Sequence, residues 1–131
     1  MWFFKKCKQA DRSLNRTERM WLNLMLTPQF SGRDILKAQL HHALVHVEQG
    51  STFHRVMFAV PKSVEKYPHA VRVPIEMRVH LPDRAPVVFL LHVVDGTINE
   101  LELFPADSSA FDPKSLCFDH LEYVINPSVT I

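Results

Sequence analysis

Hydrophobic and polar residues alternate along the chain with two different periods, and the period changes between His42 and Gly50. Between residues 15 and 40 apolar side chains recur every three or four positions, which is typical of amphipathic helices. Beyond that point they recur at every second position, which is typical of strands with one buried face. The pattern predicts an α+β fold: two N-terminal helices packed on an antiparallel β-meander.

Each predicted helix has a start signal. Asn15 with Glu18 forms a capping box, and apolar residues follow at helical spacing up to a stop before Pro28: Met20, Trp21, Leu24 and Met25. Ser31 with Asp34 forms a second box, flanked by Phe30 and Ile35 at the two staple positions. Three residues of this second helix are expected to face the core: Leu36, Leu40 and Ala43.

The end of the second helix is ambiguous, because it can run to Gly50 or give way near His42 to an alternating strand over residues 45–48. We favour the strand, since Gly50 and Ser51 then close a hairpin onto residues 53–60. Residues 71–81 alternate throughout, and Pro74 suggests an edge strand or a bulge. After the turn "PDRAP" come the apolar strand "VVFLLHVV" and, near the C-terminus, a short strand over residues 121–125.

The segment "HVVDGTINELELF", residues 92–104, is predicted to be a hairpin turning at Asp95-Gly96, a dipeptide preferred in two-residue primed turns. Counting outward from the pair Val94–Thr97 places Leu91 opposite Glu100 and Phe89 opposite Glu102. One face, expected to be the core face, then contains Val88, Leu90, His92, Asn99, Leu101 and Leu103. The other contains Val87, Phe89, Leu91, Val93, Ile98, Glu100, Glu102 and Phe104.

The second of these faces mixes carboxylates with large apolar side chains. Burial of an unpaired carboxylate costs several kcal/mol, so this face is expected to be exposed to solvent or covered by a cationic partner. An exposed apolar patch fringed by acids suits a protein–protein interface. The alternative is that Arg72 or Arg78 pairs with these acids within the sheet.

Composition restricts the function classes. The length of 131 residues fits a single domain, residues 1–131, and three glycines are too few for a phosphate-binding loop or a dinucleotide fingerprint. Two distant cysteines, Cys7 and Cys117, indicate a reducing compartment. With no signal-peptide pattern and no membrane-spanning run, a cytoplasmic location is expected.

Charge is distributed unevenly along the chain. Residues 1–40 contain eight Lys or Arg and three acids, a net charge of +5, whereas residues 95–131 contain seven acids and one lysine, a net charge of −6. Such an acidic region is suited to a basic partner. The aromatic and basic residues 2–8 raise the alternative of nucleic-acid binding, but the small charge excess favours no direct contact with nucleic acid.

The eight histidines raise a second alternative, a small metal-dependent hydrolase. His41, His42 and His46 cluster in the sequence, and the last two would share a helix face at spacing i, i+4. No carboxylate stands at the spacing of a metallohydrolase motif. We therefore expect no metal, no cofactor and no catalytic residue.

The stretch "VPIEMRVHLPDRAPVVFLLHVVDGTINELELFPADSS", residues 73–109, resembles a family of small bacterial proteins linked to immunity proteins of contact-dependent inhibition and other polymorphic toxin systems. A looser resemblance reaches back to "ILKAQL" at residues 35–40. It implies a single-domain, non-enzymatic α+β protein that binds a cognate toxin domain, often a nuclease, and occludes its active site inside the producing cell.

Combined with the hairpin analysis, this resemblance predicts the partner-binding residues. Glu100 and Glu102 are the expected charged contacts, with Asp95 and Asp107 on the same side and Phe104 as the apolar anchor.

Overall fold

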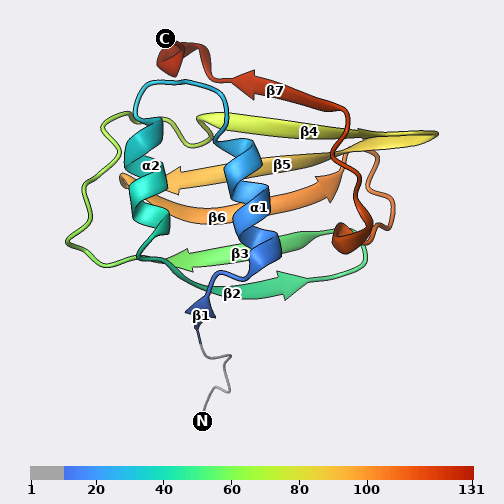
Figure 1. Ribbon diagram of the computed structural model, residues 1–131, viewed down its shortest axis with the longest axis horizontal. Coiled ribbons are helices and arrows are strands. Elements are labelled where there is room, and N and C mark those ends of the chain that lie inside the picture. Colours follow the sequence, from blue (N-terminus) through green and yellow to red (C-terminus); the bar gives the residue numbers. More distant parts are fainter. Residues whose placement is uncertain (1–10) are drawn as a thin grey trace.

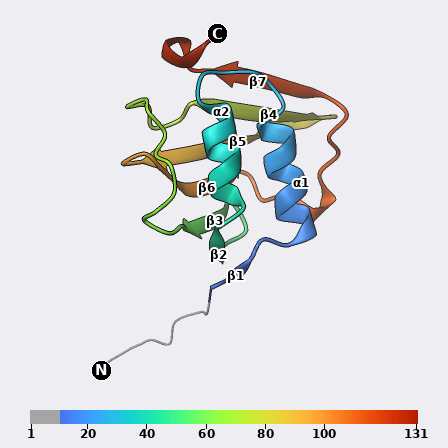
Figure 2. The ribbon, with the colours of Figure 1, turned by 60° about the vertical axis from the view of Figure 1, so that its left-hand side comes forward.

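The computed structural model describes residues 11–131 and has two helices on one face of a seven-stranded antiparallel sheet (Figure 1). The expected α+β class is confirmed. The helices are α1 (Arg16–Met25) and α2 (Arg33–Leu40), which lie side by side (Figure 2). Within residues 11–131 neither helix is long or apolar enough to cross a membrane.

The sheet has the strand order β1-β2-β3-β6-β5-β4-β7. Its strands are β1 (Arg12–Ser13), β2 (Leu44–Gln49), β3 (His54–Ala59), β4 (Ile75–Leu81), β5 (Arg84–Val94), β6 (Thr97–Pro105) and β7 (Leu121–Ile125). The expected meander is present only over β4, β5 and β6, because β3 pairs with β6 rather than with β4. The predicted β2–β3 hairpin and the strand over residues 121–125 are both confirmed.

Helix α1 begins as its sequence predicts. The Asn15 side chain accepts a hydrogen bond from the Glu18 N–H (2.8 Å), and the Glu18 carboxylate accepts one from the Asn15 N–H (2.9 Å). Trp21, Leu22 and Met25 are buried under the helix. Met20, which the spacing grouped with them, is 42 % exposed instead, because it lies on the opposite side of the helix.

Helix α2 begins differently from the prediction. Its N-cap is Gly32, with φ +85° and no side-chain cap, so the expected Ser31–Asp34 box is wrong. The Ser31 hydroxyl pairs instead with His69 Nε2 (2.8 Å). The ring of Tyr67 packs so closely on Gly32 that a Cβ there would lie 2.5 Å from its Cε1 atom. Tertiary packing with a distant loop therefore replaces the local cap.

Buried Gln39 joins α2 to the β5–β6 hairpin. Its Nε2 donates to the carbonyl oxygens of Glu65 (2.8 Å) and Gly96 (2.9 Å), and its Oε1 accepts from the Ile98 N–H (2.8 Å). A fully buried amide costs little only when its polar atoms are paired. The bonds to Gly96 and Ile98 fix the turn of the hairpin against the helical layer, and the bond to Glu65 holds the loop before β4.

Strand β4 is shorter and more central than expected. It starts after Pro74 rather than at residue 71, and it pairs with β5 on one side and β7 on the other. The inference that Pro74 marks an edge strand is wrong. Since Pro74 precedes the strand, it takes no ladder position, and its carbonyl accepts from the Asn126 N–H (3.0 Å).

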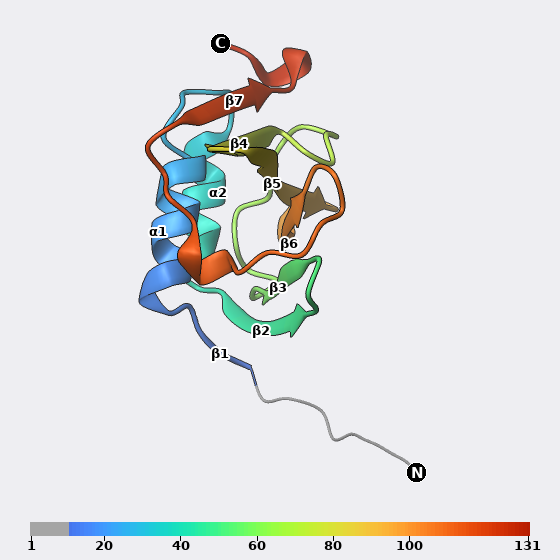
Figure 3. The same ribbon diagram turned by 90° about the vertical axis from the view of Figure 1, so that its right-hand side faces the viewer.

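The core lies between the helices and the near face of the sheet. Alternate strand residues point toward the helices and are almost fully buried, as Val56, Met77, Phe89 and Leu101 illustrate. The side view shows both helices on this one side of the strands (Figure 3). Along each strand, the residues that alternate with these buried ones point to the opposite face of the sheet. This face, which neither helix covers, is here called the open face.

Candidate functional site

A bulge in β6 decides which side chains reach the open face. Val94 pairs with Thr97 and Val93 with Ile98, but His92 then pairs with Glu100, so Asn99 is the extra residue. The turn at Asp95-Gly96 is confirmed, with φ values of +52° and +79°. Counting outward without the bulge gave the wrong register beyond Ile98. Leu91 pairs with Leu101, and Leu90 with Glu102.

The bulge also changes the composition of the two faces. The predicted core face is right for Leu101 and Leu103 but wrong for Val88, Leu90 and His92. The helix side contains Val87, Phe89, Leu91, Val93, Ile98, Leu101 and Leu103, all buried, while Val88, Leu90 and His92 join Glu100, Glu102 and Phe104 on the open face. The odd mixture of carboxylates and large core residues is thereby resolved. The large apolar side chains enter the core, and the carboxylates remain on the face without helices.

The open face combines an apolar centre with surrounding acids. Val88, Leu90 and Phe104 lie on adjacent strands, and Val88 is only 7 % exposed although no helix covers it. Five carboxylates from four strands share this face with two arginines in the strands: Glu48, Glu76, Glu100, Glu102 and Glu122, with Arg55 and Arg78. The acids therefore exceed the strand arginines by three.

The two central glutamates are paired within the sheet, but not by the arginines that the sequence suggested. Glu100 lies 3.7 Å from Arg55 Nε, and the Glu102 carboxylate lies 2.9 Å from His92 Nε2. Arg78 pairs with Glu76 instead, and Arg72 contacts His92. Arg55 also reaches Glu48 (3.5 Å), so one guanidinium serves two carboxylates.

The hydrogen bonds of His92 determine where its proton sits. Arg72 Nε–H donates a hydrogen bond to His92 Nδ1 (3.2 Å), so Nδ1 is the unprotonated ring nitrogen. The ring proton is therefore on Nε2, which donates to Glu102. Arg72, His92 and Glu102 thus form a chain of donors and acceptors across the open face. Such a chain fixes the orientation of the Glu102 carboxylate.

His92, Glu100 and Glu102 also form the one group of metal-ligand type that residues 11–131 contain. One potential ligand atom from each lies within 4.8 Å of the others. In a tetrahedral zinc site, ligands about 2.0–2.1 Å from the metal lie roughly 3.4 Å apart, so the three side chains would have to draw closer together to bind zinc. Coordination through His92 Nε2 would require that atom to lose the proton it gives to Glu102.

The other residues expected at the interface lie away from this centre. Asp95 precedes β6 in the hairpin turn and Asp107 lies two residues after its end at Pro105, so the two acids flank opposite ends of the strand. Asp107 accepts a hydrogen bond from the Ser109 N–H, and hydrogen bonding to Ser109 holds the pKa of Asp107 below its ordinary value. Of the predicted set, only Glu100, Glu102 and Phe104 come together.

The histidines that cluster in sequence do not assemble. His41 caps α2, His42 lies in the following turn, and His46 is on β2 beside Asp11 (3.7 Å). Because α2 ends at Leu40, His42 and His46 share no helix face. The basic and aromatic residues 2–8 lie outside the described part of the chain.

Sequence reasoning missed two buried titratable side chains, Glu18 and His54. Burial raises the pKa of Glu18, but hydrogen bonds from Arg12 (both 2.8 Å) and from the Asn15 N–H outweigh it and leave the pKa below its ordinary value. Burial also lowers the pKa of His54. The capping box revealed the role of Glu18 in the helix, but no local pattern marks His54 as buried.

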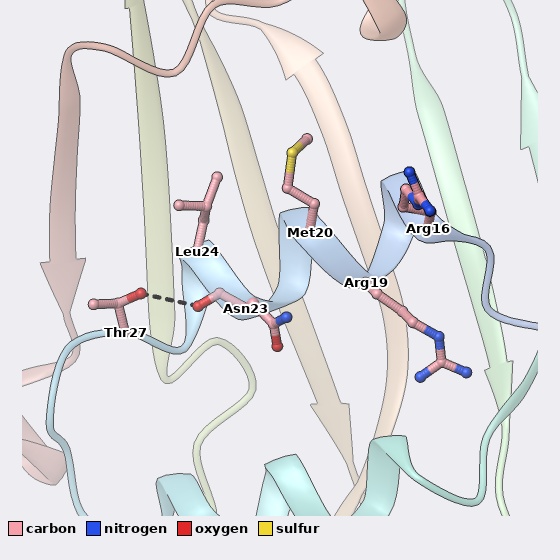
Figure 4. A pocket seen from close by; sticks show the side chains of 6 residues that line it. All are labelled: Arg16, Arg19, Met20, Asn23, Leu24 and Thr27. Carbon is pink, nitrogen blue, oxygen red and sulfur yellow. Dashed lines mark hydrogen bonds between the residues drawn. The ribbon is translucent and has the colours of Figure 1, made fainter.

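A shallow hollow runs along the outer side of α1. Figure 4 shows Arg16, Met20 and Leu24 in one row and Arg19, Asn23 and Thr27 in the next. The Thr27 hydroxyl donates to the Asn23 carbonyl oxygen (2.9 Å), a bond within the end of the helix. The hollow is lined by residues of α1 and by Thr27, two residues after the helix ends, without walls from the sheet.

No family model, curated protein or solved structure matches this chain.

Proposed function

We propose that this protein is a non-enzymatic binding protein whose open face docks on a basic protein partner. The observation that carries the proposal is the bulge at Asn99, which places Glu100 and Glu102 beside the apolar centre of that face. Protein interfaces commonly combine an apolar centre with a polar rim, and charge complementarity steers the encounter. The surplus of carboxylates over arginines selects a positively charged partner.

The partner we propose is a cognate toxin domain, as the resemblance of residues 73–109 implies. A nuclease toxin has a basic cleft for its anionic substrate, and an acidic protein surface occupies such a cleft by the same electrostatics. Neutralisation would then follow from occlusion of the cleft. Phe104 and Leu90 would supply apolar contact area, while Glu100 and Glu102 would face the basic groups that bind the substrate.

The test uses cells that express the C-terminal toxin domain encoded beside this gene. Co-expression of the wild-type protein should restore growth, and the purified pair should form a one-to-one complex. The double variant Glu100→Lys/Glu102→Lys should weaken binding at least about hundredfold, because truncation or reversal of central interface charges costs roughly 2–5 kcal/mol.

The matched control is Asp34→Lys/Asp119→Lys, which makes the same change in net charge at two exposed acids outside the centre of the open face. It should bind and protect as the wild type does. Protection that survives the Glu100/Glu102 reversal would refute the assigned surface, and absence of any rescue by the wild-type protein would refute the immunity function.

A metal-binding role is a second candidate, and the grouping of His92 with Glu100 and Glu102 favours it. Zinc or manganese binding there would be lost on His92→Ala, whereas His120→Ala, at an exposed histidine outside the group, would leave it unchanged. Calorimetric titration of the metal-free protein with zinc or manganese distinguishes the metal-binding role from the docking role. Stoichiometric binding that requires His92 would replace the docking proposal with a metal centre on the same face.

A further inference from the structure

A pocket of about 660 Å³ lies on the helix side of the sheet, separate from the open face. It is walled by the first turn of α1, by Val47 and Gln49 of β2, by His54 of β3 and by the short 3₁₀ helix η1 (Pro113–Ser115). Figures 1 and 3 both place η1 beside the beginning of α1. Segments far apart in sequence therefore converge on this space, here called the α1 pocket.

Two buried nitrogen atoms in the wall of the α1 pocket have no hydrogen-bond partner within the described chain. They are Trp21 Nε1 and His54 Nδ1, in residues that are only 3 % and 8 % exposed. Their rings meet edge to face, with centroids 5.5 Å apart. Buried polar atoms are paired in the great majority of cases, so two unpaired nitrogens side by side favour a ligand that brings an acceptor. The indole N–H is always a donor, and the neutral imidazole can present an N–H at Nδ1.

The charged groups around the α1 pocket favour an anion as that acceptor. The two acids in its wall already have donors: Glu18 accepts from Arg12 and the Asn15 N–H, and Asp112 accepts from the Lys114 N–H. Arg12 is engaged by Glu18, which leaves the exposed side chains of Arg16 and Lys114 as cations at the rim. The N-terminal end of α1 adds the positive end of the helix dipole.

We propose that the α1 pocket binds a small organic oxyanion, a carboxylate or a phosphate monoester with a modest apolar portion. Its charged group would lie between Arg16 and Lys114 and extend toward the unpaired Trp21 and His54 nitrogens. Its apolar portion would contact Val47, Pro113 and the indole ring. The pocket volume lies within the range of small-molecule sites. Nothing in this proposal depends on the open face.

The test follows the Trp21 indole N–H by NMR in the full-length Trp2→Phe background, where Trp21 is the one remaining tryptophan. Benzoate and phenyl phosphate are titrated at constant ionic strength, with chloride as balancing salt and benzyl alcohol as a neutral analogue. The proposal expects a saturable shift with at least one of the two anions, and none with chloride or benzyl alcohol. The arm that saturates identifies the carboxylate or the phosphate.

The decisive variant is Arg16→Glu/Lys114→Glu, and its matched control is Lys62→Glu/Arg84→Glu, at exposed cations outside the pocket. The first should raise the dissociation constant about tenfold or more, a change of at least about 1.4 kcal/mol, and the control should leave it unchanged. The proposal is overturned if neither anion gives a saturable shift up to about 50 mM, if benzyl alcohol shifts the resonance equally, or if the decisive variant binds as the wild type does.

Discussion

At the scale of single residues, Glu18 performs two tasks with one carboxylate. It closes the capping box of α1 and accepts both hydrogen bonds from Arg12, although it is only 2 % exposed. A buried carboxylate without such donors would take up a proton rather than stay charged. The sequence pattern revealed the first task, whereas the second depends on Arg12, which lies before the helix.

Glu18→Gln should therefore lower the free energy of unfolding by about 1–2 kcal/mol at pH 7, since it weakens a cap and a charged pair. The pKa of Glu18 is lowered in the folded protein, so its contribution is present above about pH 4.5 and is lost as the pH falls through the folded pKa. Urea unfolding at pH 7 and at pH 3 checks this. The control Glu65→Gln, at an exposed glutamate, should lose no more stability at pH 7 than at pH 3. An equal loss of stability at both pH values in Glu18→Gln would contradict the ionic role of Glu18.

His54 gives a pH dependence in the neighbouring range. Burial lowers its pKa below 6.5, so the unfolded chain binds a proton at this residue before the folded protein does. Stability should fall as the pH is lowered from about 6.5 toward the folded pKa. His54→Phe should unfold with a shallower dependence between pH 7 and pH 5.5, measured by urea titration, and His120→Phe should keep the wild-type slope. An unchanged slope in His54→Phe would refute a buried neutral imidazole.

At the scale of elements, the β5–β6 hairpin shows how one residue decides a surface. The extra residue Asn99 restores the alternation that places Ile98 and Leu101 in the core together. A regular ladder from the same turn would have directed Glu100 and Leu101 to the wrong faces, since a shift of one residue exchanges the two sides of a strand.

Deletion of Asn99 should therefore be tolerated. The shortened β6 becomes regular and keeps Ile98 and Leu101 buried, so the change in stability should stay within about 1 kcal/mol. Deletion of Glu102 is the control. It forces either a second irregularity or burial of Glu100, and should cost several kcal/mol or prevent folding. Denaturant unfolding measures the stability of both deletion variants, and NMR contacts between the backbones of Leu91 and Leu101 report their register. Loss of this contact on deletion of Asn99 would contradict the prediction, because it would show that the bulge itself sets the register.

The same hairpin shows how far sequence reasoning reached. The turn at Asp95-Gly96 was predictable because both residues adopt positive φ, which favours such a dipeptide. The capping box of α1 and the strand 121–125 were predictable for similar local reasons. The bulge was not, because every residue near Asn99 fits either register until the burial of Leu101 against the helices decides between them.

The other features that the sequence did not predict depend on contacts between distant segments. The start of α2 depends on the Tyr67 ring packing against Gly32, and the pairing of Glu102 depends on His92 across the ladder. His54 and Trp21 meet because the β2–β3 hairpin folds beneath α1. Periodicity identifies which residues prefer burial, but it does not identify which buried residues meet.

At the scale of the whole molecule, the two proposed sites lie on opposite faces of the sheet. The open face offers acids and an apolar centre, whereas the α1 pocket offers cations and unpaired donors on the helix side. Changes at well-separated sites usually add without coupling. A partner bound to the open face would leave the α1 pocket accessible, so one molecule can serve both roles.

The C-terminal segment joins the helical layer to the sheet. Strand β7 pairs with five residues of β4, the Tyr123 hydroxyl donates to the Leu24 carbonyl oxygen (2.7 Å), and the Ser31 N–H donates to the Val129 carbonyl oxygen (2.8 Å). Val129 itself is 1 % exposed. These contacts anchor the loop between α1 and α2 and cover the edge of β4.

Truncation after Asp119 should therefore remove a large part of the total stability, which for a domain is about 5–15 kcal/mol. It uncovers Ile75 and Met77 and leaves an unpaired β4 edge, so the shortened chain should be unfolded or aggregated, as circular dichroism and size-exclusion chromatography would show. Removal of the exposed Thr130 and Ile131 alone should change stability by less than about 0.5 kcal/mol. A cooperative thermal transition retained by the truncated chain would instead mean that the helices and the other six strands form a sufficient core, with β7 serving as a dispensable cover.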